Sequence, residues 1–163
     1  MSYVVIIRGP LGVGKSTVAE KLTRVLGGEY IAVDRILSEA NLDKVEEDIP
    51  IENFLKANKI LIPRIKKVLE SIKPVVLDGN FYYKEAIEDL EKNIDAKIFG
   101  FTLKAPVEVC IERDKNREKT HGELSARAVY SLVSKFDYGE VVQTEGKSIE
   151  QVAQEILDRI KKG

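Results

Sequence analysis

One run of eight residues has the types and the spacing that hold a phosphate group: Gly9, Pro10, Leu11, Gly12, Val13, Gly14, Lys15 and Ser16. It fits the pattern G-x-x-x-x-G-K-[ST], in which glycines let successive backbone N–H groups surround an anion. The lysine of this pattern reaches the β- and γ-phosphates of a nucleotide, and the hydroxyl after it binds Mg²⁺. We therefore expect the whole run and Thr17 to bind a nucleotide, with Lys15 on its phosphates and Ser16 as a metal ligand.

Two aspartates are candidates for the chemistry around that phosphate. Asp34 follows the β-branched run Tyr30–Val33, and Asp78 follows the apolar run Val75–Leu77. Ligands of open α/β sheets bind beyond the carboxyl ends of the strands. We expect Asp34 to accept or orient the proton of a substrate hydroxyl, and Asp78 to hold Mg²⁺ directly or through water. The alternatives are a helix N-cap for Asp34 and a turn residue for Asp78.

The neighbours of these aspartates could line the site of a phosphate acceptor. Arg35 follows Asp34 and could bind an anionic group, and Gly79 and Asn80 follow Asp78. We expect Asp34, Arg35, Gly79 and Asn80 to contact the acceptor, and a tyrosine pair two residues further along to stack on it. The alternatives are a solvated surface arginine and plain turn chemistry.

Two arginines, Arg113 and Arg117, stand four residues apart and therefore face the same way on a helix. They open the strongly charged segment 114–123, which contains Gly122 and lacks apolar periodicity. A lid that carries these arginines would neutralise transition-state charge and exclude water, so we expect both to be catalytic. The alternative is a solvated helix face on which glutamates pair with arginines.

Strands and helices alternate along the chain. Apolar, β-branched runs predict strands at residues 3–7, 30–33, 75–77, 97–103 and 141–142. Apolar residues at helical spacing predict helices at 17–26, 36–40, 54–72, 86–90 and 126–136, one opened by Ala105-Pro106, and one after the capping box Ser148–Gln151. Pro63 should kink the long helix or mark its entry. The alternation predicts a three-layer α/β/α fold with a parallel five-stranded sheet.

The composition limits the classes of protein. The 163 residues carry a net charge of −1, with 44% hydrophobic and 33% charged residues, which is typical of a globular domain. The single cysteine, Cys110, excludes an intrachain disulfide. Because no apolar run could cross a bilayer and a strand begins at Tyr3 without a signal peptide before it, we expect a cytoplasmic protein with no membrane partner. The low net charge disfavours nucleic acid as a partner, although Arg64, Lys66 and Lys67 could form a local basic patch.

These motifs together resemble the small P-loop kinases related to nucleoside monophosphate kinases. Within them the chain is most similar to the group of shikimate, gluconate, adenylylsulfate and polynucleotide kinases. The resemblance spans nearly the whole chain, and it is carried by residues 9–17, 33–35, 76–80 and 105–117. It departs from shikimate kinases at Ala32, where those enzymes carry the first aspartate of Asp-x-Asp, and at Gly79-Asn80, where they carry Gly-Gly. The departures argue against shikimate as the substrate.

The resemblance implies one P-loop kinase domain over residues 1–163, with a lid at about 114–123 and strand order 2-3-1-4-5. It implies ATP and Mg²⁺ as cofactors and transfer of the γ-phosphate to a small-molecule acceptor by a monomer or homodimer. It also implies that adenine lies near the lid helix and around residues 144–147.

Two other functions share these motifs. A nucleic-acid 5′-hydroxyl kinase would use the same chemistry on a larger partner. A P-loop NTPase or nucleotide switch would lack an acceptor. A guanine-specific switch needs Asn-Lys-x-Asp, and the nearest run, Asn58-Lys59-Ile60-Leu61, lacks the aspartate.

Overall fold

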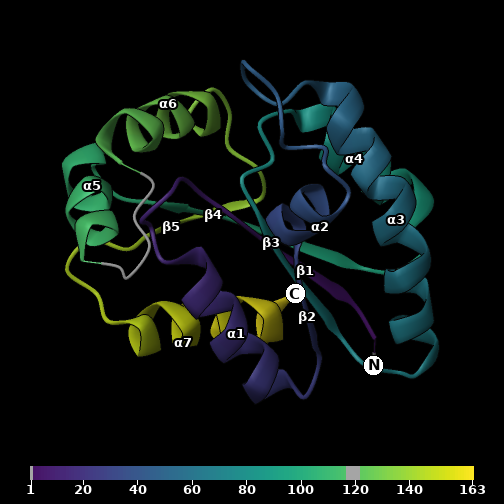
Figure 1. The fold of residues 1–163 in the computed structure, drawn as a ribbon. Coiled ribbons are helices and arrows are strands. Elements are labelled where there is room, and N and C mark those ends of the chain that lie inside the picture. Colours follow the sequence, from purple (N-terminus) through teal and green to yellow (C-terminus); the bar gives the residue numbers. More distant parts are fainter. Residues whose placement is uncertain (1, 117–121) are drawn as a thin grey trace.

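The computed structural model describes residues 2–116 and 122–163. Its sheet consists of β1 (Val4–Arg8), β2 (Glu29–Ala32), β3 (Val75–Gly79), β4 (Ile98–Lys104) and β5 (Glu140–Gln143). All neighbouring strands are parallel, and their order in the sheet is β2-β3-β1-β4-β5. The predicted three-layer class and the predicted strand order are therefore confirmed (Figure 1).

Helices cover both faces of the sheet (Figure 1). On one face lie α1 (Lys15–Leu26) and α7 (Ile149–Lys162), and on the other lie α2 (Val33–Glu39), α3 (Ile51–Glu70) and α4 (Lys84–Asn93). The remaining pair, α5 (Val107–Lys115) and α6 (Glu123–Val133), pack on each other beside the sheet. Among the described residues, no helix combines the length and the apolar character that a membrane span requires.

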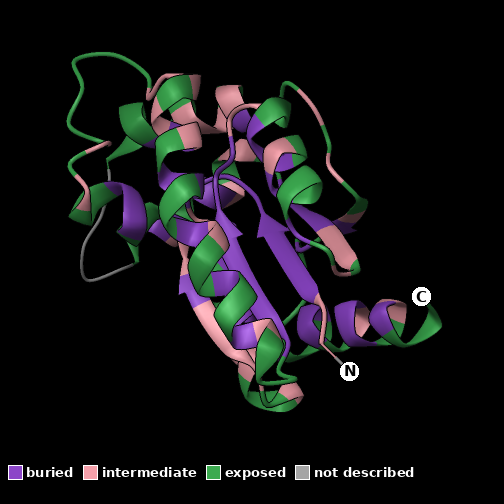
Figure 2. Ribbon diagram, turned by 90° about the vertical axis from the view of Figure 1, so that its right-hand side faces the viewer, coloured by how far each residue is buried: buried purple, intermediate pink, exposed green. Residues whose placement is uncertain are grey.

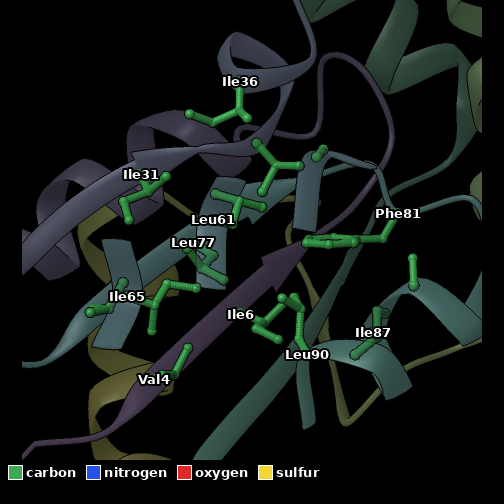
Figure 3. Packing of buried hydrophobic residues seen from close by; sticks show 14 of the residues in the cluster. Val4, Ile6, Ile31, Ile36, Leu61, Ile65, Leu77, Phe81, Ile87 and Leu90 are labelled. Atoms are coloured by element: carbon green, nitrogen blue, oxygen red, sulfur yellow. The ribbon is translucent and has the colours of Figure 1, made fainter. Parts of the chain in front are cut away.

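Two apolar clusters fill the spaces between the sheet and its helices. Side chains alternate in direction along β1, so Ile6 belongs to the cluster under α2, α3 and α4, and Ile7 belongs to the cluster under α1 and α7. Figure 3 shows the first cluster, in which Leu61 of α3, Leu77 of β3 and the ring of Phe81 come together. β1 and β3 are buried along their whole length because helices cover both faces of a parallel sheet (Figure 2).

Two strand ends differ from the prediction in a way that bears on function. β2 ends at Ala32, so Asp34 lies in the first turn of α2 instead of following a strand directly. Asp78 is part of β3, whose last residue is Gly79. Since Ala32 lies opposite Asp78 in the parallel register, both aspartates still belong to the carboxyl edge of the sheet.

Helix boundaries were predicted less well than helix positions. α3 begins at Ile51 and contains Pro63 in its interior, so the proline is not the entry point of the helix. The start of α7 matches the prediction, because the backbone N–H of Gln151 donates to Ser148 Oγ at 3.1 Å and the N–H of Ser148 donates to Gln151 Oε1 at 2.8 Å.

Candidate active site

The predicted phosphate-binding loop connects β1 to α1. Gly12 and Gly14 adopt φ angles of 79° and 97°, which residues with side chains rarely adopt. A Cβ atom on Gly12 would lie 2.1 Å from the carbonyl oxygen of Cys110, so the loop packs directly on the backbone of α5. α1 begins at Lys15, and no side chain caps it and no acidic residue occupies its first turn. Its free N–H groups and the positive end of its dipole are therefore available to an anion.

A pocket of about 210 Å³ lies at this loop, lined by Gly12, Gly14, Lys15, Ser16, Thr17 and Arg113. Lys15 is only 6% exposed. A buried ammonium group is stable only beside anionic partners. The pocket thus offers a concave, cationic site of the kind that phosphate groups occupy.

Asp78 is buried beside this pocket. The hydroxyl of Tyr30, on β2, donates a hydrogen bond to Asp78 Oδ2. Burial raises the pKa of Asp78, while the hydroxyls of Tyr30 and Ser16 and the ammonium of Lys15 act in the opposite direction. The two predicted metal ligands, Ser16 and Asp78, therefore lie together. Tyr30 was not predicted as a site residue, and its only signal was a hydroxyl-bearing side chain within an edge strand.

Ser16 and Asp78 fit a Mg²⁺ ion that arrives with a nucleotide. Both offer oxygen atoms, and Mg²⁺ usually takes one or two protein ligands and completes its octahedron with water and substrate phosphates. The part of the chain that the structure describes holds no group of three or more His, Cys, Asp or Glu side chains suited to a metal. This donor set favours a nucleotide-bound ion over a metal held by the protein alone.

Asp34 lies at the same edge of the sheet and is exposed. Burial is the main cause that raises the pKa of Asp78 and of Tyr82, and the carboxylate of Asp34 is close enough to raise both further. The N-cap position of α2 is occupied by Ala32, so Asp34 does not have the alternative role of an N-cap. The carboxylate is therefore free to face a ligand between the phosphate loop and the segment after β3.

Arg113 connects α5 to the loop after β5. Its Nη1 atom donates to the carbonyl of Val13 at 3.2 Å and to Thr144 Oγ1 at 3.0 Å, and its Nη2 atom donates to the carbonyl of Thr144 at 3.2 Å. Arg113 also lines a second pocket of about 240 Å³, which includes Thr144, Lys147 and Ile149. This pocket lies where the resemblance to small P-loop kinases implies the adenine. Arg113 thus stands between the phosphate pocket and the second pocket, whereas Arg117 and residues 118–121 of the predicted lid lie outside the described residues.

The end of β3 places Gly79 against Val33 at the start of α2, and Asn80 follows directly. A Cβ atom on Gly79 would lie 3.0 Å from the ring of Phe81 and 3.0 Å from Val33, so this turn is tightly packed. Asn80 is buried, and its Oδ1 atom has no hydrogen-bond partner among the described residues. Arg35, the fourth predicted acceptor ligand, is exposed on α2.

Arg8 is a buried residue of this region that the sequence analysis missed. It ends β1, directly before the phosphate loop, and it is 0% exposed. Its Nε, Nη1 and Nη2 atoms donate to the carbonyls of Phe81, Phe136 and Val133 at 3.1, 2.9 and 2.7 Å. Its guanidinium also lies 3.9 Å from the centre of the Phe136 ring. The only signal in the sequence was a charged residue at the end of an apolar strand.

The basic patch proposed for nucleic acid lies away from this site. Arg64 pairs with Glu29 at 3.6 Å, and Glu29 is the first residue of β2. Arg64 and Lys67 line a pocket with Glu29 and Lys73. Because the strands are parallel, this pocket is at the opposite edge of the sheet from the phosphate loop.

Known proteins share both the sequence pattern and the fold. The model of a family described as AAA domain matches residues 4–137. The chain is 28% identical to a putative adenylate kinase of Thermococcus onnurineus over 162 residues, which cover 98% of this chain and 85% of that protein. It is 37% identical to a probable gluconokinase of Schizosaccharomyces pombe over 51 residues, which cover 31% of this chain and 26% of that protein.

A solved gluconokinase structure from Sinorhizobium meliloti 1021 has a TM-score of 0.78 to this chain and covers 98% of it. The match covers 92% of the gluconokinase chain at 17% sequence identity, so it is evidence for the fold alone. The family match, the parallel sheet of order 2-3-1-4-5 and the phosphate loop at its carboxyl edge agree with one another. The chain belongs to the AAA domain family and is, by its loop and its fold, a small P-loop kinase of the nucleoside monophosphate kinase-like group.

Proposed function

We propose that this protein is an ATP- and Mg²⁺-dependent phosphotransferase that moves the γ-phosphate to a hydroxyl or phosphate of a small-molecule acceptor. One observation carries the proposal. Buried Lys15 lines the phosphate pocket, and the carboxylates of Asp78 and Asp34 lie next to it on neighbouring elements. A cationic phosphate cradle beside a buried metal ligand and an exposed carboxylate has the parts that phosphoryl transfer needs.

Each part has a distinct role in the proposed reaction. The loop N–H groups and Lys15 bind the β- and γ-phosphates and stabilise the charge of the transferring group. Ser16 and Asp78 would hold Mg²⁺, which supplies further charge neutralisation when bound. Asp34 accepts the proton of the acceptor hydroxyl as the new bond to phosphorus forms and the bond to the β,γ-bridging oxygen breaks.

The segment 114–123 is proposed to act as a lid over the nucleotide. Arg113, held by Thr144 and by the phosphate loop, would contact the nucleotide between its base and its phosphates. Arg117 would approach the γ-phosphate when the lid closes. The proposal covers one kinase domain over residues 1–163, acting as a monomer or homodimer.

The acceptor class is open to a direct experiment. The named relatives phosphorylate different compounds: a gluconokinase acts on gluconate and an adenylate kinase on a nucleotide, so both classes belong in the test. We would incubate the protein with γ-labelled ATP, Mg²⁺ and separate pools of nucleosides, nucleotides, sugars, sugar acids and short oligonucleotides. Label on one pool, lost in Lys15→Ala, is the expected result. Label found only as free phosphate would instead indicate an NTPase or nucleotide switch.

The role of Asp34 is tested by Asp34→Asn. Removing a catalytic base slows the chemical step by about 10²- to 10⁴-fold. Because Asp34 lies outside the phosphate pocket, the affinity for ATP should stay within about twofold of wild type. Turnover that survives Asp34→Asn would show that another group takes the proton.

A further inference from the structure

Asn80 carries a buried side-chain oxygen that no described residue satisfies. The residue is 8% exposed, and its Oδ1 atom has no hydrogen-bond donor in the described part of the chain. Leaving a buried acceptor unpaired costs stability, and native proteins rarely do so without a reason. At the carboxyl edge of the sheet, beside the phosphate pocket, the unpaired oxygen indicates a ligand that brings a hydrogen-bond donor.

Asn80 belongs to an acidic and aromatic surface, called the acidic wall below, that is formed by Asp34, Asp48, Phe54, Asn80 and Tyr82. Its amide lies beside the hydroxyl of Tyr82. Burial is the main cause that raises the pKa of this hydroxyl, and the nearby carboxylates of Asp34 and Asp48 raise it further. The ring of Tyr82 contacts the ring of Phe54 edge-on, with centres 5.5 Å apart. The groups that face a ligand here are therefore hydrogen-bond acceptors, a tyrosine hydroxyl and an aromatic surface.

The chain between residues 34 and 50 is strongly acidic. Six carboxylates against two cations give it a formal charge of −4. The carboxylates are Asp34, Glu39, Asp43, Glu46, Glu47 and Asp48, and the cations are Arg35 and Lys44. An anionic acceptor would approach this segment against electrostatic repulsion.

The described arginines that could offset this charge are mostly engaged by other groups of the chain. Five of the seven bind carbonyls, hydroxyls or carboxylates: Arg8, Arg64, Arg113, Arg127 and Arg159. Arg8 reaches this region, at the carbonyl of Phe81, but all three of its donor nitrogens bind backbone carbonyls. Arg24 lies in the last turn of α1, at the far end from the phosphate loop. Arg35 alone among the described arginines stands at this edge, exposed and directly after Asp34.

We propose that the acceptor is a neutral or cationic hydroxyl compound, namely a sugar, polyol, nucleoside or amino alcohol, whose reacting hydroxyl binds Asp34 and whose second donor group binds Asn80 Oδ1. The inference rests on the proposed phosphotransferase function and narrows its acceptor. The reacting hydroxyl gives its proton to Asp34, its oxygen forms a bond to the γ-phosphorus, and ADP leaves as the bond to the bridging oxygen breaks.

The chemistry of the acidic wall favours a hydrogen-bond donor over an anionic acceptor. A phosphate or carboxylate group brings negative charge and hydrogen-bond acceptors, which would face Asn80 Oδ1 and two carboxylates. Sites that bind such anions usually present the planar fork of an arginine, which pairs with two anionic oxygens at once. A hydroxyl or ammonium group instead supplies the missing donor to Asn80 and gains from the nearby carboxylates.

The first test compares acceptors by charge. With γ-labelled ATP and Mg²⁺, one arm holds glucose, ribose, myo-inositol, adenosine, cytidine, glucosamine and ethanolamine, and the other holds AMP, CMP, gluconate and shikimate. Label on a compound of the first arm supports the inference. Label only on a compound of the second arm overturns it and leaves the phosphotransferase function intact. Free phosphate as the sole product in both arms overturns both.

The second test uses Asn80→Leu and Asn80→Asp with the best acceptor of either arm. Asn80→Leu removes the acceptor oxygen at similar size, so KM for the acceptor should rise about tenfold or more. Asn80→Asp keeps an acceptor oxygen, and the Tyr82 hydroxyl can donate to it, so KM should stay within about threefold of wild type. The KM for ATP should not change in either variant. A general loss of structure would raise the KM for ATP as well, so this measurement separates the two causes.

The matched control is Asn93→Leu. Asn93 is an exposed asparagine near the end of α4 whose amide bonds only Asp89 among the described residues, so its removal should not change the KM for the acceptor. The inference is overturned if Asn80→Asp loses acceptor affinity as fully as Asn80→Leu, because the ligand then binds the amide Nδ2. It is also overturned if Asn80→Leu behaves like Asn93→Leu. If Asn80→Leu does not fold, the Asn80→Asp comparison with wild type still decides the outcome.

Discussion

Single side chains adjust the charge balance of the phosphate site. The Tyr30 hydroxyl holds Asp78 from the neighbouring strand, and Lys15 and Ser16 approach the same carboxylate. A buried carboxylate held this way keeps one orientation before any ion or nucleotide binds. In metal sites, partners of this kind orient the ligand and are often as important as the ligand itself.

Tyr30→Phe tests this arrangement at the residue scale. Losing the hydroxyl removes the donor that orients Asp78, so we expect the Mg²⁺ concentration for half-maximal nucleotide binding to rise about tenfold. Tyr3→Phe is the control, because Tyr3 packs on Phe99 through its ring, away from the phosphate site. Equal Mg²⁺ titrations for Tyr30→Phe and wild type would mean that the Tyr30 hydroxyl has no part in metal binding.

At the scale of elements, close backbone contacts set the positions of the phosphate loop and of α5. Gly12 leaves no room for a side chain, because a Cβ atom there would overlap the carbonyl of Cys110. The loop and α5, which leads into the predicted lid, are therefore one packed unit. A change in the loop should move α5, and with it Arg113.

Gly12→Ala should push the phosphate loop away from α5. The new methyl group needs both a positive φ and space that the α5 backbone occupies, so we expect a loss of about 3 kcal/mol in unfolding free energy and a clear loss of nucleotide affinity. Gly27→Ala is a matched control, because Gly27 also has a positive φ of 65°, but no atom of the described residues lies within 4 Å of a Cβ placed there. The Gly27→Ala variant should lose about 1–2 kcal/mol in unfolding free energy and bind nucleotide with the affinity of wild type. Denaturant unfolding and nucleotide titration of both variants measure the difference.

Arg8 connects β1 to three other parts of the chain. Its three carbonyl partners belong to the segment after β3, to the last residue of α6 and to the chain beyond α6. A cation near the carboxyl end of a helix also interacts favourably with the helix dipole. Burial lowers the pKa of Arg8 to about 10, so the guanidinium stays charged at neutral pH.

Arg8→Met should therefore destabilise the fold despite the apolar surroundings. Methionine leaves three carbonyls without donors, and we expect a loss of about 2–4 kcal/mol in unfolding free energy. Arg8→Lys keeps the charge and part of the hydrogen bonding and should lose less. A value for Arg8→Met within about 0.5 kcal/mol of wild type would contradict this role. The measurement is urea unfolding followed by circular dichroism.

At the scale of the whole molecule, the single thiol reports on folding. Cys110 is 1% exposed, and burial raises the pKa of its thiol although Arg113 and Lys15 oppose the shift. The reactive thiolate is thus scarcer in the folded protein than in a free cysteine at the same pH. Labelling by iodoacetamide at pH 8 should be slow in buffer and fast in denaturant, and its rate should rise with pH. Labelling as fast as that of free cysteine under native conditions would mean that α5 opens readily from the phosphate loop.

Much of the fold could be predicted because its signals are local. The phosphate loop, the alternation of strands and helices and the capping box at Ser148 are each encoded within a few consecutive residues, and each appears where expected. The start of α3 was predicted three residues late, although Pro50 directly before Ile51 is a signal of a helix start. The end of β2 was predicted one residue late, since the apolar Val33 continues the strand pattern. The placement of Asp34 and Asp78 at one edge followed from the general rule for parallel sheets.

The sequence by itself determined the phosphate loop and the order of the elements, and with them the class of chemistry. Only the tertiary structure decided that Tyr30 binds Asp78, that Arg8 binds the carbonyls of three segments, and that Asn80 keeps an oxygen without a partner in the described part of the chain. The bonded groups are 48 to 128 residues apart in the chain. No local sequence pattern predicts such a pairing. It depends on which strand ends and helix ends lie next to one another once the sheet has formed.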